Sequence, residues 1–334
     1  MPAGNLHAVA RRHRHREDNG PKDNLVRLLV ASAATWPDST AFIPLADEEP
    51  TRVADDEAPL KILLVNAHPD DESEAAGFVY RVTHERGGVA DQVVVTNGEA
   101  GYRFSTPAEA YYRLRLATDV GKPELLSQIR REELMRASRI LGIRNTYFLS
   151  QEDTGPSFHP GDALRAWDIS RVKHELRMLL QFGNYQVVLL LLPSHDTHGH
   201  HQAVAALTLD LLAELEPEDR PAVLGVRSVS GEDGTRENFS ELPEYPITRA
   251  TTAEPLWTFN RRSSLECHSS LDYTIIANWV IAEHKSQGFF QMEFARKTHE
   301  NYWLFAACGD AGAARWRDVL QQITHRQAEA AFRD

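Results

Sequence analysis

Short apolar runs alternate with helical segments from Leu60 onward, and this alternation constrains the fold more than any other feature of the chain. Strands are predicted at 62–65, 92–96, 146–149 and 187–192. Helices are predicted at 71–85, 130–141, 163–180, 201–215 and 271–284. Strands that alternate with helices form βαβ units with right-handed crossovers. We therefore expect an α/β fold, with a Rossmann-like, mostly parallel sheet that carries helices on both faces.

The first 58 residues differ from the rest in composition. A basic run at 11–18 and an acidic stretch at 46–59 occur in this part, whereas the strand and helix pattern begins later. We expect three parts: a partly flexible N-terminal extension at 1–58, one domain at 59–310, and a C-terminal helix at 311–334 packed on that domain. Residues 216–262 are rich in Pro, Glu and Gly and are expected to mix loops with short strands.

The bulk composition excludes several classes of protein. A net charge of -12 argues against a general nucleic-acid binder and against an anionic membrane surface. We expect no membrane span, because no run approaches the roughly 18 uncharged apolar residues that one needs. Two cysteines cannot form a disulfide framework, so nothing requires an oxidising compartment. The expected location is the cytoplasm.

Histidines and acids follow two of the predicted strands. After the first strand come His68, Asp70 and Asp71. After the strand at 187–192 come His195, Asp196, His198, His200 and His201. The carboxyl ends of parallel strands meet at one edge of the sheet, where ligands bind. Groups that are so costly to desolvate indicate a metal ion at this edge.

Each cluster also has a reading without a metal. The acids of the first cluster could complement the dipole of a helix N-terminus, and this reading is preferred for Glu72 and Glu74. The second cluster could be a solvated loop. Because both clusters fall at strand ends, the two accidents together are much less probable than a site.

A catalytic zinc takes three protein ligands from His and carboxylate groups and leaves one position open. One His and one acid from the first loop and one His from the second would complete such a set. An acid left over could act as a general base for water. The ligand types also admit other divalent metals such as Fe²⁺.

Five segments, in order, resemble the LmbE-like family of metal-dependent deacetylases, which includes the N-acetylglucosaminyl-phosphatidylinositol de-N-acetylases and the deacetylases of the mycothiol and bacillithiol pathways. They are AHPDDES, TNGEAG, RREELMRASRILGI, HGHHQA and HKSQ, within residues 60–290. The resemblance implies a Rossmann-like fold and a zinc-dependent hydrolase. Such an enzyme removes the N-acetyl group of an amino sugar or its glycoside, releasing acetate and a free amine.

The resemblance also implies roles for single residues. It implies His68, Asp71 and His201 as metal ligands. Asp70 matches the general base, and His198 matches the histidine that stabilises the oxyanion. The positions implied near the substrate are Arg130, Glu99 and His284, the last as a minor contributor that shapes the site.

The second histidine motif departs from the family at His200, where the family usually has Asp or Asn. His200 is itself a candidate ligand, and Asp196 is a candidate replacement for the missing acid. Two other functions stay open: a metal amidase acting on a non-sugar amide or a thiol conjugate, and a non-catalytic ligand-binding protein. The expected partner is a small N-acetylated substrate, and a homo-oligomer is left open.

Overall fold

The computed structural model describes residues 59–117, 123–231, 237–294 and 296–324. The predicted N-terminal extension at 1–58 lies outside the described residues, and so does the end of the predicted C-terminal segment, 325–334. Within the described parts of the chain, none of the helices combines the length and the apolar character needed to cross a membrane.

A seven-stranded sheet in the order β3-β2-β1-β4-β5-β9-β6 forms the centre of the molecule. Its strands are β1 (Lys61–Asn66), β2 (Val89–Thr96), β3 (Ile143–Gln151), β4 (Val187–Leu191), β5 (Ala222–Val229), β6 (Trp257–Asn260) and β9 (His299–Leu304). The pairs from β3 to β5 are parallel, and β9 runs antiparallel to both β5 and β6. A separate hairpin joins β7 (Ser264–Leu265) to β8 (His268–Asp272).

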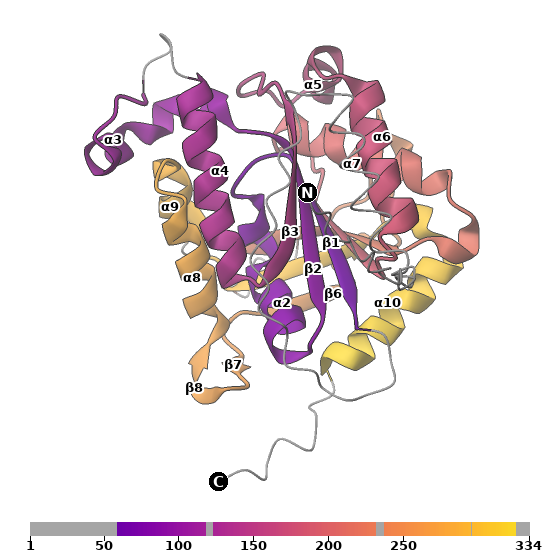
Figure 1. The fold of residues 1–334 in the computed structure, drawn as a ribbon. Coiled ribbons are helices and arrows are strands. Elements are labelled where there is room, and N and C mark those ends of the chain that lie inside the picture. Colours follow the sequence, from indigo (N-terminus) through magenta and orange to yellow (C-terminus); the bar gives the residue numbers. More distant parts are fainter. Residues whose placement is uncertain (1–58, 118–122, 232–236, 295, 325–334) are drawn as a thin grey trace, which may run out of the picture.

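Helices cover both faces of the sheet, which confirms the predicted fold class. They are α2 (Ala76–Tyr80), α3 (Thr106–Tyr112), α4 (Pro123–Ile140), α5 (Pro160–Ala166), α6 (Ile169–Phe182), α7 (Gly199–Ala213), α8 (Tyr273–Glu283), α9 (Gly288–Phe294) and α10 (Gly309–Thr324). Figure 1 shows α4 and α8 on one side of the sheet and α5 to α7 on the other. Short turns of other helix types are η1 (Asp71–Ala75), η2 (Arg81–Glu85), η3 (Glu99–Ser105), η4 (Pro217–Asp219), η6 (Pro246–Thr248) and η7 (Ala306–Cys308).

The helix predicted at 71–85 is replaced by three short pieces, η1, α2 and η2, of which η1 is a 3₁₀ turn and η2 a π turn. The backbone N–H groups of Gly77 and Phe78 donate to the buried carboxylate of Glu300, at 2.7 and 3.1 Å. A regular helix beginning at residue 71 would use these N–H groups for its own ladder. A tertiary contact from β9 therefore determines where the α-helical turn begins.

The helix predicted at 163–180 is divided into α5 and α6. Trp167 has an extended backbone and ends α5, while its indole N–H donates to the carbonyl of Glu152 at 2.8 Å. Asp168 then caps α6 by accepting the N–H of Arg171 at 3.0 Å. An N-cap aspartate begins a new helix because its side chain satisfies one of the free N–H groups.

The region at 216–262 contains more regular structure than expected. It holds β5, an eight-residue strand that is buried along most of its length, as well as β6. The antiparallel pairing of β5 with β9, about 70 residues later, completes this strand. The apolar residues at 222–226 were the available local signal for β5.

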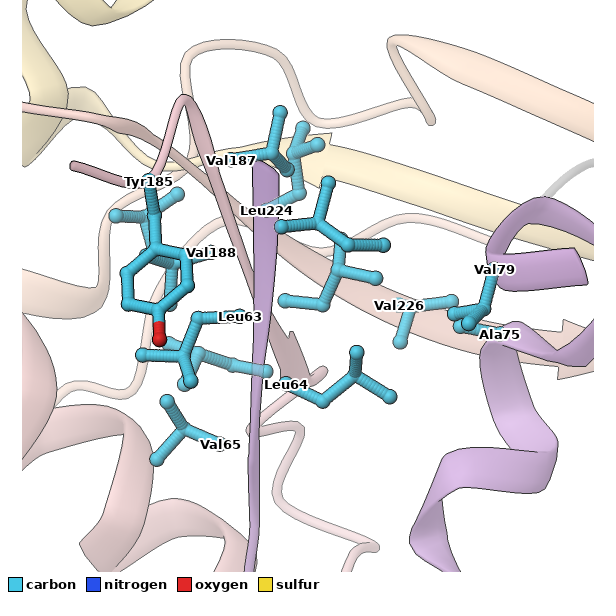
Figure 2. Packing of buried hydrophobic residues seen from close by; sticks show 14 of the residues in the cluster. Leu63, Leu64, Val65, Ala75, Val79, Tyr185, Val187, Val188, Leu224 and Val226 are labelled. Atoms are coloured by element: carbon cyan, nitrogen blue, oxygen red, sulfur yellow. The ribbon is translucent and has the colours of Figure 1, made fainter. Parts of the chain in front are cut away.

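The core is centred on β1, β4 and β5. Leu64 pairs with Leu189 in the parallel register of β1 and β4. Figure 2 shows Leu63 and Val65 on one side of β1, and Leu64 on the other side, toward Val79. All of these side chains are buried, so β1 is covered on both faces. Burial on both faces explains why β1 reads as a continuous apolar run rather than an alternating one.

Candidate metal centre and active site

Three strand ends bring polar side chains to one edge of the sheet. His68 follows β1, Asp153 follows β3, and His198 precedes α7 in the segment after β4. The chain leaves β1 toward β2 on one side and leaves β4 toward β5 on the other. The crevice between β1 and β4 is therefore the switch point of the sheet, the place where ligands bind in folds of this class.

His68, Asp71 and His201 come together in this crevice. His68 Nδ1 lies 3.1 Å from His201 Nε2, and Asp71 Oδ1 lies 3.3 Å from His201 Nε2 and 3.8 Å from His68 Nδ1. The other oxygen of Asp71, Oδ2, accepts the backbone N–H groups of Ala67 and His68 at 2.8 and 2.9 Å. These bonds fix the carboxylate with Oδ1 facing the two histidines. Two nitrogens and one oxygen at this spacing fit a divalent cation such as zinc.

The ionisable side chains of this group strongly shift the pKa values of one another. Burial alone would raise the pKa of Asp71, but the charges and hydrogen bonds of His201 and His68 bring it well below its ordinary value. Burial would likewise lower the pKa of His68, yet the hydrogen bond and charge of Asp71 raise it to about 9. The negative charge of Asp71 is thus available in the crevice, as a cation requires.

Asp70 has a different environment from its neighbour. Its side chain lines the cavity in front of the crevice. Burial, followed by the negative charge of Asp71, raises the pKa of Asp70 to about 7. A carboxyl group with a pKa near neutrality can accept and return a proton under ordinary conditions. Asp70 and Asp71 cannot be told apart from the sequence. In the structure their carboxylates point in different directions and their pKa values differ.

His198 is the N-cap of α7, where its Nδ1 accepts the backbone N–H of His200 at 3.1 Å. Its Nε2 lies 2.9 Å from the carbonyl oxygen of Gly155. A carbonyl oxygen can only accept, so the ring proton is on Nε2. Burial and the charges of His68 and His201 lower the pKa of His198 to about 4. His198 is therefore a neutral imidazole that holds a proton at Nε2.

His200, the residue that departs from the family, is 1% exposed and contacts His68 from behind. Its Nδ1 lies 2.9 Å from His68 Nε2, and its Nε2 lies 2.8 Å from Thr154 Oγ1. Burial and the charges of His68 and His198 lower its pKa to about 2. A metal-binding histidine is normally oriented by a group that contacts its second ring nitrogen. For His68, that group is the neutral imidazole of His200.

Asp196, the candidate replacement for the missing acid, is bonded to other residues. Its carboxylate accepts from Arg227, at 3.0 and 2.9 Å, and from Ser194, at 2.6 Å. The acid that lies near His200 is Asp153, with Oδ1 3.8 Å from His200 Nδ1. Asp153 was not among the residues predicted from the sequence. Its position directly after the third strand was the available signal, since the other two clusters also follow strands.

A cavity of about 770 Å³ opens in front of this crevice. Arg130 lines it and is only 3% exposed. One nitrogen of Arg130, Nη1, donates to the carbonyl of Gly98, whereas Nε and Nη2 have no hydrogen-bond partner among the described residues. A Cβ on Gly98 or Gly101 would approach the guanidinium to 2.2 or 2.3 Å, so a side chain at either position would displace Arg130. A buried guanidinium with free donors at a cavity wall is suited to bind a ligand oxygen.

Glu99 and His284 do not line the cavity. Glu99 Oε1 accepts the backbone N–H of Asp153 at 3.2 Å and so holds the loop after β3. His284 is fully buried, with Nε2 2.5 Å from Glu72 Oε1. Glu72 and Glu74 were expected to be acids at an ordinary helix end, but both are buried, and Glu74 accepts the backbone N–H of Ser228.

Comparison with known proteins matches residues 63–212 to the family described as PIG-L: GlcNAc-PI de-N-acetylase. The chain is 24% identical over 193 residues to a probable N-acetyl-alpha-D-glucosaminyl L-malate deacetylase 2 of Bacillus cereus, spanning 56% of this chain and 79% of that protein. It is 28% identical over 188 residues to the protein of the same name from Bacillus anthracis, spanning 55% and 74%.

Among solved structures, the N,N'-diacetylchitobiose deacetylase from Pyrococcus horikoshii matches with a TM-score of 0.45 and 17% identity, over 74% of this chain and 84% of that one. The family match covers the β1 loop, the loops after β2 and β3, and the start of α7. His68, Asp70, Asp71, Arg130, Asp153, His198, His200 and His201 all fall within it, whereas His284 does not. Residues 63–212 therefore match a PIG-L family domain, which confirms the resemblance indicated by the motifs.

Proposed function

We propose that this protein is a divalent-metal-dependent N-deacetylase that acts on an N-acetylated amino sugar or its glycoside. The observation that carries the proposal is the group formed by His68, Asp71 and His201 at the switch point, with Asp70 beside it. The family match and the names of the relatives support the amino sugar as substrate. The donor set fits zinc and also admits Fe²⁺. The proposal keeps the cytoplasmic location expected from the sequence.

The substrate enters the cavity in front of the crevice. The free donors of Arg130, Nε and Nη2, bind an oxygen of the sugar, because a buried guanidinium without acceptors is costly. Tyr102 and Phe290 also line this cavity. A cavity with both aromatic and cationic groups is suited to a ring that has both apolar and hydroxyl surfaces.

The chemistry divides among the residues around the metal. When bound by His68, Asp71 and His201, a divalent cation supplies Lewis acidity at the amide carbonyl and makes water more acidic. Asp70 takes the proton of the attacking water, since its pKa is raised to about 7. Asp70 then returns this proton to the leaving nitrogen. The C–N bond breaks, and the products are acetate and the free amine.

His198 acts as a neutral donor in this scheme. The resemblance implies an oxyanion-stabilising histidine here, and the lowered pKa of His198 indicates that it is not an imidazolium in the resting enzyme. Its Nε2 proton, which now bonds the carbonyl of Gly155, turns toward the carbonyl oxygen of the substrate as negative charge develops. A donor aimed at developing charge stabilises the transition state more than the ground state.

The test is an amine-release assay. Purified protein is incubated with N-acetylglucosamine and with its glycosides, and free primary amine is measured with fluorescamine, with and without a chelator. We expect amine and acetate to appear in equal amounts and the chelator to stop their release. Restoring zinc, or Fe²⁺ under reducing conditions, should recover activity. Saturable binding without amine release would favour a non-catalytic protein, and turnover of non-sugar amides alone would favour the other amidase.

A further inference from the structure

A second group of possible metal ligands lies behind the first. It consists of His68, His198 and His200, and one ring nitrogen from each lies within 4.8 Å of the others. His68 belongs to both groups but through different atoms. Its Nδ1 faces His201, whereas its Nε2 faces His200 Nδ1 at 2.9 Å. The two ring nitrogens of His68 can therefore bind two different ions.

We propose that His68, His198 and His200 form a second site for a zinc-like divalent cation, which shares His68 with the first site. Three imidazoles are a ligand set that zinc accepts, with one position left for water. His200 Nδ1 and His68 Nε2 are 2.9 Å apart, slightly closer than the roughly 3.3 Å that ligands of a tetrahedral zinc require. Only a small movement of one ring is needed to admit the ion.

The protons balance in this arrangement. His198 ligates through Nδ1, which carries no proton, and the ion replaces the backbone N–H of His200 there. The proton of His198 stays on Nε2, next to the carbonyl oxygen of Gly155. His200 ligates through Nδ1 and keeps its proton on Nε2, next to Thr154 Oγ1. His68 ligates through both nitrogens once both sites are filled, so its Nε2 proton passes to solvent. The carboxylate of Asp153, 3.8 Å from His200 Nδ1, supplies negative charge beside the second ion. Because a proton must be lost, the second ion binds more weakly than the first.

The location of the second site determines its effect. His200 is 1% exposed and does not line the cavity, whereas His68 and His198 do. The second ion therefore lies at the cavity wall. It binds Nδ1 of His198 and so keeps this ring from turning its Nε2 proton toward the substrate, as the proposed function requires. Filling the second site should inhibit an enzyme whose first site is already filled.

The test counts bound ions and so does not depend on activity. Wild-type protein is dialysed to equilibrium against increasing zinc, and its metal content is measured by elemental analysis. We expect binding in two steps, to about two ions per chain. His200→Asn should bind only the tighter ion, and Asp71→Asn should lose that tighter ion. The matched control is His195→Ala, which removes an exposed histidine of the same loop and should bind as the wild type does.

The outcomes separate this inference from the proposed function on which its inhibitory effect rests. Wild-type protein that binds a single ion, lost in Asp71→Asn, would overturn the second site and leave the first intact. Two ions retained in folded His200→Asn would also overturn it, because the second ion would then lie elsewhere. Loss of an ion in His195→Ala would assign that ion to the surface. Protein that binds none at all would contradict both proposals.

Discussion

The two loops that form the site use their polar residues differently. In the first, at 68–74, every acid is at least partly buried, and Asp71, Glu72 and Glu74 each have an identified partner. In the second, at 194–201, His198 and His201 line the cavity and His200 contacts His68, whereas His195 and Asp196 are exposed. The denser cluster in the sequence therefore contributes a smaller fraction of its residues to the site.

The secondary structure that follows each loop explains this difference. The first loop continues into η1, which lies against β5, so its side chains meet the sheet on most sides. The second loop continues into α7, and a helix directs only part of each turn toward its neighbour. His198 is fixed as the N-cap, and His201 follows in the first turn. Residues before the cap are free to face solvent.

The largest effect should come from the two adjacent acids of the first loop. Asp70→Asn removes the general base and should lower kcat by roughly 10²–10⁴-fold while the metal remains bound. Asp71→Asn removes a ligand, so it should lower metal affinity, and added zinc should partly restore activity. Metal content and kcat measured together on both variants provide the check.

A reversed result would exchange the two roles. If Asp70→Asn were to empty the metal site while Asp71→Asn kept it full but slow, the inward Oδ1 of Asp71 would not be a ligand. If neither change altered turnover, the hydrolase itself would be excluded.

The sheet and the crevice could be predicted from the sequence, but some contacts of the buried side chains could not. The strand pattern predicted the sheet, and the histidines after two strands predicted the crevice, because parallel strands end at one edge. The burial of Glu72 against His284 could not be predicted, since the two residues are 212 positions apart. The contact between His200 and His68 was likewise hidden, because it depends on the tertiary pairing of β1 with β4.

The next effect concerns stability and the innermost acid of the first loop. Glu72 and His284 are both fully buried and form an ion pair at 2.5 Å. Glu72→Gln leaves His284 without its charged partner, and breaking a buried pair from one side costs about 3–5 kcal/mol. Chemical denaturation should therefore show a large loss in the free energy of unfolding, and a loss below about 1 kcal/mol would show that the pair contributes little.

The same pair gives a dependence on pH. Burial would lower the pKa of His284, but the charge and hydrogen bond of Glu72 raise it above the ordinary value of 6.5. A raised folded-state pKa stabilises the protein fully below the unfolded value and less as pH rises through the folded value. The difference in unfolding free energy between wild type and Glu72→Gln should therefore decrease as pH rises above 6.5. A difference that grows with pH would contradict the assignment of charge to His284.

Replacing His198, in the second loop, should have a somewhat smaller effect on catalysis than replacing Asp70. His198→Ala removes the Nε2 donor that is proposed to stabilise the oxyanion, a loss of roughly 10²–10³-fold in kcat. The tighter metal ion should remain, because His198 is not in the group with Asp71. His198→Gln keeps a side-chain N–H donor and should recover part of the activity. Equal kcat in both variants would mean that His198 only caps α7.

The smallest effect should come from replacing Asp196, an exposed residue of the second loop. Asp196 is about half exposed, and its hydrogen bonds to Arg227 and Ser194 lower its pKa well below the ordinary value. An exposed ion pair contributes only about 0–1 kcal/mol, and Arg227 keeps a second acid, Glu237, at 2.7 Å. Asp196→Asn should therefore leave kcat and metal content unchanged and reduce stability slightly. A lowered folded-state pKa stabilises fully above the unfolded value of about 4 and progressively less as the pH falls toward the folded value, so even this small loss should shrink below pH ~4. A tenfold fall in kcat, or loss of the metal, would instead mean that Asp196 replaces the acid that His200 displaced, and that the second loop directs all of its polar residues to the site as the first does.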